Sequence, residues 1–320
     1  MSTPIIKKLP AFEKDPDKGV SNTYDTKEFM FKQPALWMIC GSRGLGKSHL
    51  CSKFLAQAKK DNVFDNCYLI SPSYLSNLSY FGKFVPPENA YAPTKDSIDL
   101  VIKEVEKERD EWEEYQSKLL EYKEFKKLMA DKTIENMDID EETISIYDDA
   151  GFFEGPPEWK RKTIRPATSI LILDDVIGTS AIAQSSGLTR LAVANRHQGE
   201  LKDAYMGRSA LGLAVIILVQ TYRAGSGVGT GRVLRENLSL FTTFKWKMEK
   251  QLDAMREEIG AVIDLDKFDA AYKVATEKKH GSLTIDFTAK CNTLTFRKGL
   301  GEAIIFPDQI CECSNKNVVK

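Results

Sequence analysis

Apolar residues along this chain gather in short continuous runs that polar segments separate. Such runs occupy residues 35–40, 67–71, 169–173 and 211–219, and a further apolar segment covers 240–246. Their length and near-continuous hydrophobicity are typical of parallel β-strands that are buried on both faces. Between the runs, apolar residues recur at helical spacing, as they do at Leu50, Phe54 and Leu55. The pattern predicts an α/β fold with a mostly parallel central sheet flanked by helices.

The remaining segments complete the expected organisation. Residues 1–33 are expected to form an extended N-terminal arm and residues 34–320 a single domain, whose last part, 248–320, holds charged helices and small strands. Those strands are expected at 282–287 and 293–296, and a helix at 188–194. Loops or linkers are expected at 131–160, after residue 199 and in the glycine-rich stretch 221–231.

A long charged segment interrupts the pattern of strands and helices. Glu, Lys, Asp and Arg dominate residues 95–135, and apolar residues recur there at spacings of three and four (Ile98, Val101, Ile102, Val105, Trp112, Leu119, Tyr122 and Phe125). This spacing predicts one long helix or a helical pair with one thin apolar stripe. Two interpretations remain open: a solvated helix with ion pairs one turn apart, or a lid or subunit-contact arm inserted into the domain.

A phosphate-binding pattern follows the first apolar run directly. The chain reads Gly41-Ser42-Arg43-Gly44-Leu45-Gly46-Lys47-Ser48-His49, which matches G-x-x-x-x-G-K-[ST] up to Ser48. The glycines allow backbone N–H groups to point at phosphate oxygens, and Lys47 places a positive charge against the β- and γ-phosphates. Ser48 offers a hydroxyl to Mg²⁺, while the helix after the loop directs its positive end at the phosphates. These nine residues are the predicted ATP-binding set.

Two carboxylates end the third apolar run. Asp174 and Asp175 follow Leu173, and the carboxyl end of a buried parallel strand opens at the ligand crevice of an α/β sheet. Asp174 is therefore expected to hold Mg²⁺ beside Ser48, and Asp175 to polarise the attacking water. An ordinary strand end is the alternative, and the phosphate loop upstream argues against it.

A polar residue also ends the run 211–219. Gln220 is predicted to reach the γ-phosphate or the lytic water and to act as a sensor; a glutamine that merely bonds a loop is the alternative.

Composition limits the function classes. The formal net charge of −1 gives no global basic signature for nucleic acid, although a local basic surface such as a ring pore is compatible with it. No apolar stretch is long enough to span a bilayer and the N-terminus has no secretion core, which predicts a cytosolic protein. The six cysteines are scattered and expected to be reduced, and Cys311-Glu312-Cys313 is a weak candidate for a metal site.

The order of these motifs resembles the FtsK–HerA superfamily of ring-forming DNA pumps. The motifs are the phosphate loop, Ile172-Leu173-Asp174-Asp175, Arg196-His197 before the sensor strand, Gln220 at its end, and Arg235-Glu236-Asn237 before a further strand. Within that superfamily the chain is most similar to the poxvirus-type genome-packaging ATPases of large double-stranded DNA viruses and virophages. The resemblance covers residues 34–80 and 165–250, and the charged segment departs from the family's short form.

The resemblance implies an ATP-driven motor that moves double-stranded DNA, independently of its sequence, into a preformed capsid. It implies a pentameric or hexameric ring with ATP sites between subunits, Mg²⁺ as cofactor, and an arginine supplied by a neighbouring subunit. Arg196 is the first candidate for that arginine, Arg235 the second and Arg190 the third. DNA contact is expected from pore loops, with Arg223 and Arg232 flanking one of them. A capsid vertex protein is the expected partner, and the virus assembly site in the cytoplasm of the infected cell, or the virion, the expected location.

Three other functions compete with this one. Another translocase or helicase of the same superfamily fits the motifs almost as well. A GTPase would need an Asn/Thr-Lys-x-Asp motif after a late strand, which the sequence lacks in a suitable place. A structural assembly protein that binds nucleotide without hydrolysing it is the alternative of another class, and the intact Lys47, Asp174 and Asp175 argue against it.

Overall fold

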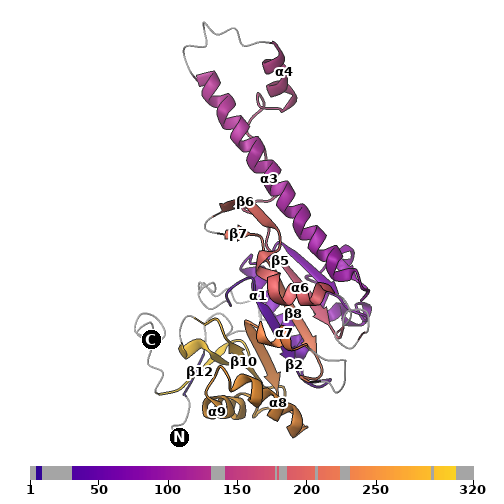
Figure 1. Cartoon of the computed structure of the whole chain (residues 1–320), viewed down its shortest axis with the longest axis vertical. Coiled ribbons are helices and arrows are strands. Elements are labelled where there is room, and N and C mark those ends of the chain that lie inside the picture. The colour runs from indigo at the N-terminus through magenta and orange to yellow at the C-terminus, as the bar shows by residue number, and fades with distance from the viewer. Residues whose placement is uncertain are drawn as a thin grey trace.

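The computed structural model describes residues 5–8, 31–130, 141–176, 179, 186–205, 208–223, 231–289 and 292–307. In these residues a ten-stranded sheet has the order β1-β12-β11-β10-β9-β2-β8-β5-β3-β4, and a separate hairpin joins β6 and β7 (Figure 1). The strands are β1 (Ile5–Lys8), β2 (Leu36–Cys40), β3 (Asn66–Ile70), β4 (Ala90–Tyr91), β5 (Ser169–Asp174), β6 (Glu200–Tyr205), β7 (Arg208–Ala210), β8 (Leu213–Val219), β9 (Leu240–Phe244), β10 (Ser282–Asp286), β11 (Phe296–Lys298) and β12 (Glu302–Ile305). The α/β fold with a mostly parallel central sheet is as the sequence predicts.

The parallel strands end together at one edge of the sheet. β2 lies between β8 and β9, and Cys40 at its end is opposite Val219 and Thr243. β5 lies on the other side of β8, with Asp174 opposite Leu218. We call the edge at which β2, β5 and β8 end the carboxyl edge. This register places the phosphate loop, the aspartate pair and Gln220 at one end of the sheet.

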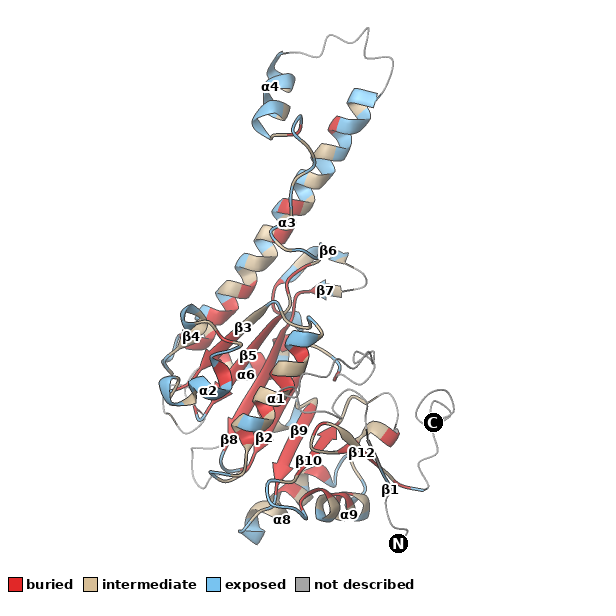
Figure 2. Ribbon diagram, turned by 180° about the vertical axis from the view of Figure 1, so that it is seen from behind, coloured by how far each residue is buried: buried red, intermediate tan, exposed pale blue. Residues whose placement is uncertain are grey.

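Helices cover both faces of the parallel strands. They are α1 (Lys47–Lys60), α2 (Leu78–Phe81), α3 (Ser97–Ala130), α4 (Glu141–Asp149), α6 (Ser186–Ala194), α7 (Arg232–Glu236), α8 (Glu249–Ile259) and α9 (Leu265–Ala275), with short 3₁₀ turns at Leu75–Asn77, Pro87–Asn89, Asn195–His197 and Asn292–Leu294. Adjacent strand residues point to opposite faces, so Ile39 packs with Phe54 of α1, whereas Met38 packs in the cluster that includes Phe268 of α9. Each such fully buried side chain contributes about 1.5–3 kcal/mol. Figure 2 shows the resulting buried sheet between its helices.

Antiparallel strands extend the sheet beyond β9. β10 pairs with β9, and β11, β12 and β1 follow outward, with Ile5 opposite Ile305. The strand expected at 293–296 is replaced by a 3₁₀ turn at Asn292–Leu294, and the strand β11 begins at Phe296. The strand β12 was not predicted. Part of the N-terminal arm forms β1, which is the edge strand of the sheet. Residues 1–4 and 9–30 of that arm lie outside the described residues.

The charged segment forms one long helix rather than a helical pair. α3 packs on the sheet through residues near its start and then projects away from the domain (Figure 1). Further along, Trp112 contacts the rings of Trp159 and Tyr205, and near its end Phe125 contacts Tyr147 of α4 at a centroid distance of 5.1 Å. The prediction of a loop at 131–160 is wrong for residues 141–149, because aromatic packing on α3 stabilises the helix α4 there.

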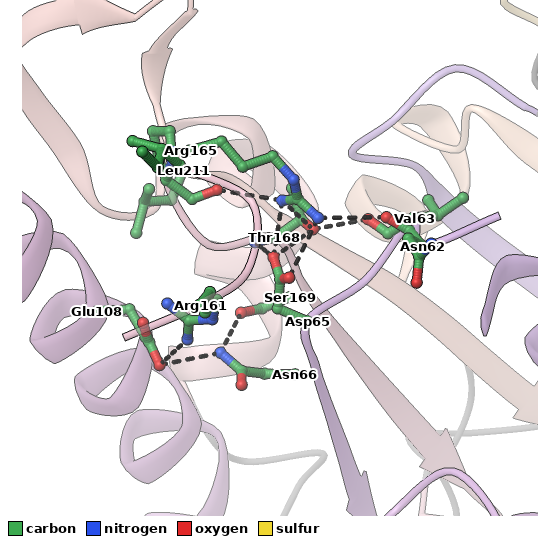
Figure 3. A network of polar contacts seen from close by, with 12 residues as sticks. Asn62, Val63, Asp65, Asn66, Glu108, Arg161, Arg165, Thr168, Ser169 and Leu211 are labelled. Atoms are coloured by element: carbon green, nitrogen blue, oxygen red, sulfur yellow. Dashed lines mark hydrogen bonds and ion pairs between the residues drawn. The ribbon is translucent and has the colours of Figure 1, made fainter. Parts of the chain in front are cut away.

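Polar contacts join α3 to the edge of the sheet that lies opposite the carboxyl edge. Glu108 of α3 accepts hydrogen bonds from Arg161 and from Asn66, the first residue of β3 (Figure 3). Beside them, Arg165 donates to both carboxylate oxygens of Asp65 at 2.7 and 3.1 Å. The long helix α3 therefore projects from the edge of the sheet that is remote from the phosphate loop.

The middle of the chain contains a hairpin that the sequence did not predict. The stretch after residue 199 is a hairpin, β6 and β7, rather than a linker. Among the described residues, no helix combines the length and apolarity that a membrane crossing requires.

Candidate nucleotide-binding site

The phosphate loop lies at the centre of the carboxyl edge. Gly41 donates its backbone N–H to Val219 of β8 at 3.0 Å, and a Cβ atom at Gly41 would lie 2.8 Å from the ring of Phe244. Gly44 and Gly46 have φ values of 80° and 102°, which side-chain-bearing residues rarely adopt. The turn ends at Gly46 and α1 begins at Lys47, so the strand–loop–helix context that the motif requires is present.

Lys47 is folded back into the loop. Its ammonium group donates to the carbonyl oxygens of Gly41 at 2.8 Å and Ser42 at 3.5 Å, and the residue is 8% exposed. Burial lowers the pKa of Lys47, while the neighbouring charges of Asp175 and Asp174 act in the opposite direction. The loop therefore encloses a largely desolvated cation, which suits the charge of a phosphate group.

Asp174 is the buried carboxylate of the site. It is 3% exposed, and one of its oxygens accepts from Asn77 at 2.9 Å and from the Ser71 hydroxyl at 3.3 Å. Burial, followed by the neighbouring charge of Asp175, raises the pKa of Asp174 to about 6. Sequence reasoning did not identify Asn77, which lies in a short 3₁₀ turn with no motif of its own.

This carboxylate suits a magnesium ion that phosphate helps to bind. In the described part of the chain, its second oxygen accepts no hydrogen bond, and no group of three or more His, Cys, Asp or Glu residues is arranged to hold a metal. Mg²⁺ is commonly held by one or two protein oxygens together with phosphate and water. Asp174 and the half-buried hydroxyl-bearing Ser48 fit that type of site.

Asp175 and Gln220 meet at the end of their strands. Asp175 leaves β5 in a left-handed conformation, with φ of 52°, and is exposed. The side-chain amide of Gln220 donates to its carboxylate at 3.0 Å. The geometry thus brings together the two residues predicted to orient and polarise water, although they lie 45 positions apart.

The candidate arginines lie elsewhere. Arg196 is exposed, and its neighbour Asn195 donates its side-chain amide to the carbonyl oxygen of Leu213 at the start of β8. Arg196 therefore lies near the edge opposite the phosphate loop, about 20 Å away along β8. Arg235 donates twice to Glu258, and Arg190 pairs with Asp99 of α3. No contact recorded for the described residues joins these arginines to the loop, and action from a neighbouring copy stays a prediction.

The other predicted residues lie on the surface, are partly buried, or fall outside the described residues. Arg43 and His49 are exposed on the loop and on the first turn of α1. Arg223 pairs with Glu257 and Glu258, and Arg232 with Glu236. Residues 224–230 between them, and Cys311 and Cys313, lie outside the described residues.

His280 is a neighbour of the loop that sequence reasoning missed. Its Nδ1 lies 3.3 Å from the carbonyl oxygen of Leu45, and its backbone has φ of 65°. It belongs to the turn between α9 and β10, which also carries the exposed residues Lys278 and Lys279. The strand β10 begins beside the end of β9, so this turn necessarily lies at the carboxyl edge.

Removal of the His280 contact is expected to weaken ATP binding more than catalysis. In His280→Asn, the side chain is too short to keep the contact but tolerates the left-handed backbone. One lost hydrogen bond corresponds to an increase of about two- to tenfold in the KM for ATP, with kcat within about twofold. Steady-state kinetics checks this, with Lys279→Ala as the control; an unchanged KM in His280→Asn would show that the contact is incidental.

The strand order and the site define the class of fold. The phosphate-loop strand β2 has β8 and then the aspartate-bearing β5 on one side and β9 on the other. With the loop and the aspartate pair at the carboxyl edge, this is the fold of the P-loop ATPases.

Comparison with known proteins finds several similar solved structures. The structure is similar to that of a genome packaging NTPase, B204, from Sulfolobus turreted icosahedral virus 2 in complex with ATP-gammaS; identity is 14%, the match covers 83% of this chain and 97% of that chain, and the TM-score is 0.41. It is also similar to TcpA, the pCW3 conjugation coupling protein, with ATPgS (16% identity, 86% and 61% covered, TM-score 0.41). A third similar structure is EssC, ATPases 2 and 3, from Geobacillus thermodenitrificans (15% identity, 88% and 41% covered, TM-score 0.38). No family model and no curated protein matches the sequence.

Proposed function

We propose that this chain is a Mg²⁺-dependent ATPase that translocates double-stranded DNA, and that it packages a viral genome into a preformed capsid. The observation that carries the ATPase part is the 3.0 Å hydrogen bond between Gln220 and Asp175 beside the phosphate loop. A site that only binds nucleotide needs the loop and Lys47. It has no need of an exposed carboxylate that a glutamine orients at the same edge of the sheet.

Each residue has a defined task in the proposed hydrolysis. The backbone of the loop and Lys47 hold the β- and γ-phosphates, and Asp175, oriented by Gln220, accepts the proton of the attacking water. Asp174 and Ser48 would hold Mg²⁺, which neutralises charge on the phosphates when bound. Asn77 and Ser71 keep Asp174 in place through hydrogen bonds to its other oxygen.

The motor part of the proposal rests on the motif order. Arg196-His197 before β8 and Gln220 at its end are the motifs that resemble the poxvirus-type packaging ATPases. Arg196 lies near the edge opposite the phosphate loop, so it can serve only the site of another copy. A head-to-tail ring, pentameric or hexameric, supplies such a contact at every interface. A capsid vertex protein is the proposed partner of that ring.

Translocation and packaging have separate tests. A motor that moves along duplex DNA is expected to displace a short third strand from a triplex in the presence of ATP and Mg²⁺, and not with a non-hydrolysable analogue. Absence of displacement would leave an ATPase of another function, such as an assembly protein. In the virus, loss of the gene is expected to give assembled but empty capsids, and filled capsids would contradict packaging.

A further inference from the structure

One carboxylate, that of Glu258 in α8, receives hydrogen bonds from three residues in two parts of the chain. Glu258 of α8 accepts from the hydroxyl of Tyr222 at 2.7 Å. Arg223 donates to it through Nε at 3.0 Å and Nη2 at 2.6 Å, and Arg235 of α7 through Nε at 2.8 Å and Nη2 at 3.0 Å. Burial alone would raise the pKa of Glu258, but the hydrogen bonds from Arg235, Tyr222 and Arg223 outweigh it and lower this pKa to about 2. The carboxylate is therefore charged at every physiological pH.

The segment that forms these hydrogen bonds begins two residues after Gln220, the predicted sensor. Gln220 contacts Asp175. Tyr222 and Arg223, which follow Gln220 closely in the chain, donate hydrogen bonds to Glu258 of α8. Gln251, seven positions before Glu258 on α8, accepts from the backbone N–H groups of both and donates to the carbonyl of Arg223 at 2.9 Å. Since positions seven apart lie on one helix face, α8 holds the segment after β8 along its length.

The arrangement is sensitive to small displacements. Both arginines donate to Oε1 of Glu258, and Arg235 also donates to Oε2. Hydrogen bonds weaken outside a narrow range of distance and angle. A shift of the segment after β8 relative to α7 by about 1 Å would therefore break bonds to one arginine or the other. A cavity of about 560 Å³, lined by Tyr222, Arg223, Arg232, Arg235 and Glu257 among others, lies beside the carboxylate and gives these side chains room to move.

We propose that Glu258 is a positioning residue that transmits the state of the γ-phosphate site from Gln220 to α7. The proposal rests on the ATPase and DNA-motor function proposed above. When the phosphate is cleaved, Gln220 changes its contacts; the attached segment then moves with it, and Glu258 carries the displacement to Arg235 and α7. Arg223 directly precedes residues 224–230, and Arg235 belongs to α7, the helix that follows them. Residues 224–230 are predicted to contact DNA.

The chain offers a matched pair of variants. Glu258→Gln keeps the size of the side chain but replaces one acceptor oxygen by an NH₂ group, which cannot accept from a guanidinium group. The variant therefore no longer holds Arg223 and Arg235 together through one carboxylate. Its neighbour Glu257 pairs with Arg223 at 2.9 Å and, within the described residues, with no other cation; its side chain is 71% exposed. Glu257→Gln therefore changes the same charge at the next position without affecting the link to α7.

The first readout does not depend on DNA. Hydrogen exchange of residues 232–236 is expected to differ between the ADP-bound and the ATP-analogue-bound states in the wild type and in Glu257→Gln. In Glu258→Gln this difference is expected to disappear. A difference of wild-type size in Glu258→Gln would overturn the proposal, as would its absence from the wild type.

The second readout is the stimulation of ATP hydrolysis by duplex DNA. Glu258→Gln is expected to keep the basal rate within about twofold of the wild type while its stimulation falls to near onefold. Tyr222→Phe, which removes one donor and keeps the ring packed on Phe241, is expected to lose part of the stimulation and guards against a folding defect in Glu258→Gln. Wild-type stimulation in both variants would overturn this inference alone, whereas a wild-type protein without stimulation would overturn the motor function and the inference together.

Discussion

Replacement of Lys47 by alanine is expected to abolish ATP hydrolysis, with a loss of at least about 10²–10³-fold in kcat. Lys47 is the buried cation of the phosphate loop, and its ammonium group is held by the carbonyl oxygens of Gly41 and Ser42. The variant therefore removes the positive charge that the loop places against the β- and γ-phosphates. Mg²⁺-dependent phosphate release measures the effect.

The control for this variant lies on the same helix. Lys60 is exposed at the end of α1, so Lys60→Ala is expected to leave hydrolysis unchanged. Thermal unfolding of Lys47→Ala in the absence of nucleotide shows whether the fold is intact. Hydrolysis that persists in a folded Lys47→Ala protein would place the active site elsewhere.

Replacement of Asp174 by asparagine is expected to abolish hydrolysis and to stabilise the nucleotide-free protein. The variant loses the carboxylate that would bind Mg²⁺, which removes activity. It also removes a charge from a residue that is 3% exposed. Because burial raises the pKa of Asp174 to about 6, the ionised form costs the folded state about 3 kcal/mol near pH 7.

This cost has a defined dependence on pH. The pKa of Asp174 is higher in the folded than in the unfolded protein, so the folded state binds the proton more tightly. The resulting stabilisation is complete below about pH 4 and is lost as the pH rises to about 6. The wild type is expected to lose stability across that interval relative to Asp174→Asn. The Glu258 contribution has the opposite sign and is lost below about pH 4.5, where it does not obscure the effect.

Denaturant unfolding at several pH values checks this prediction, and Asp175→Asn is the control. Asp175 is exposed, so its replacement is expected to remove hydrolysis without a comparable gain in stability. If Asp174→Asn is less stable than the wild type at pH 7, the buried charge is not a cost to the empty site. Both variants are compared with the wild type in the absence of Mg²⁺ and nucleotide.

The sequence was sufficient for five parallel strands of the sheet and for the centre of the site, but it did not predict the short parallel strand β4. Buried parallel strands leave continuous apolar runs, and β2, β3, β5, β8 and β9 lie where those runs predict them. Because parallel strands share one carboxyl edge, Asp175 and Gln220 could be expected to lie close together, and the structure places them in contact.

The remaining elements depend on distant partners that leave no local signal. α4 is stabilised by aromatic packing on Phe125, and the hairpin β6–β7 has a mostly exposed surface without an apolar alternation. His280 and Asn77 reach the site only through the tertiary fold, since neither belongs to a motif. The same holds for Arg235, whose pairing with Glu258 spans 23 positions.

The most direct test of the proposed function is the rate of ATP hydrolysis with and without double-stranded DNA. Purified protein is to be assayed with Mg²⁺ at low salt, with Lys47→Ala as the background, and then at increasing salt. The proposal predicts hydrolysis that requires Mg²⁺, that duplex DNA of any sequence stimulates, and whose stimulation declines with salt because phosphate contacts carry the binding. Hydrolysis that DNA leaves unchanged at every salt concentration, or no hydrolysis at all, would contradict a DNA motor.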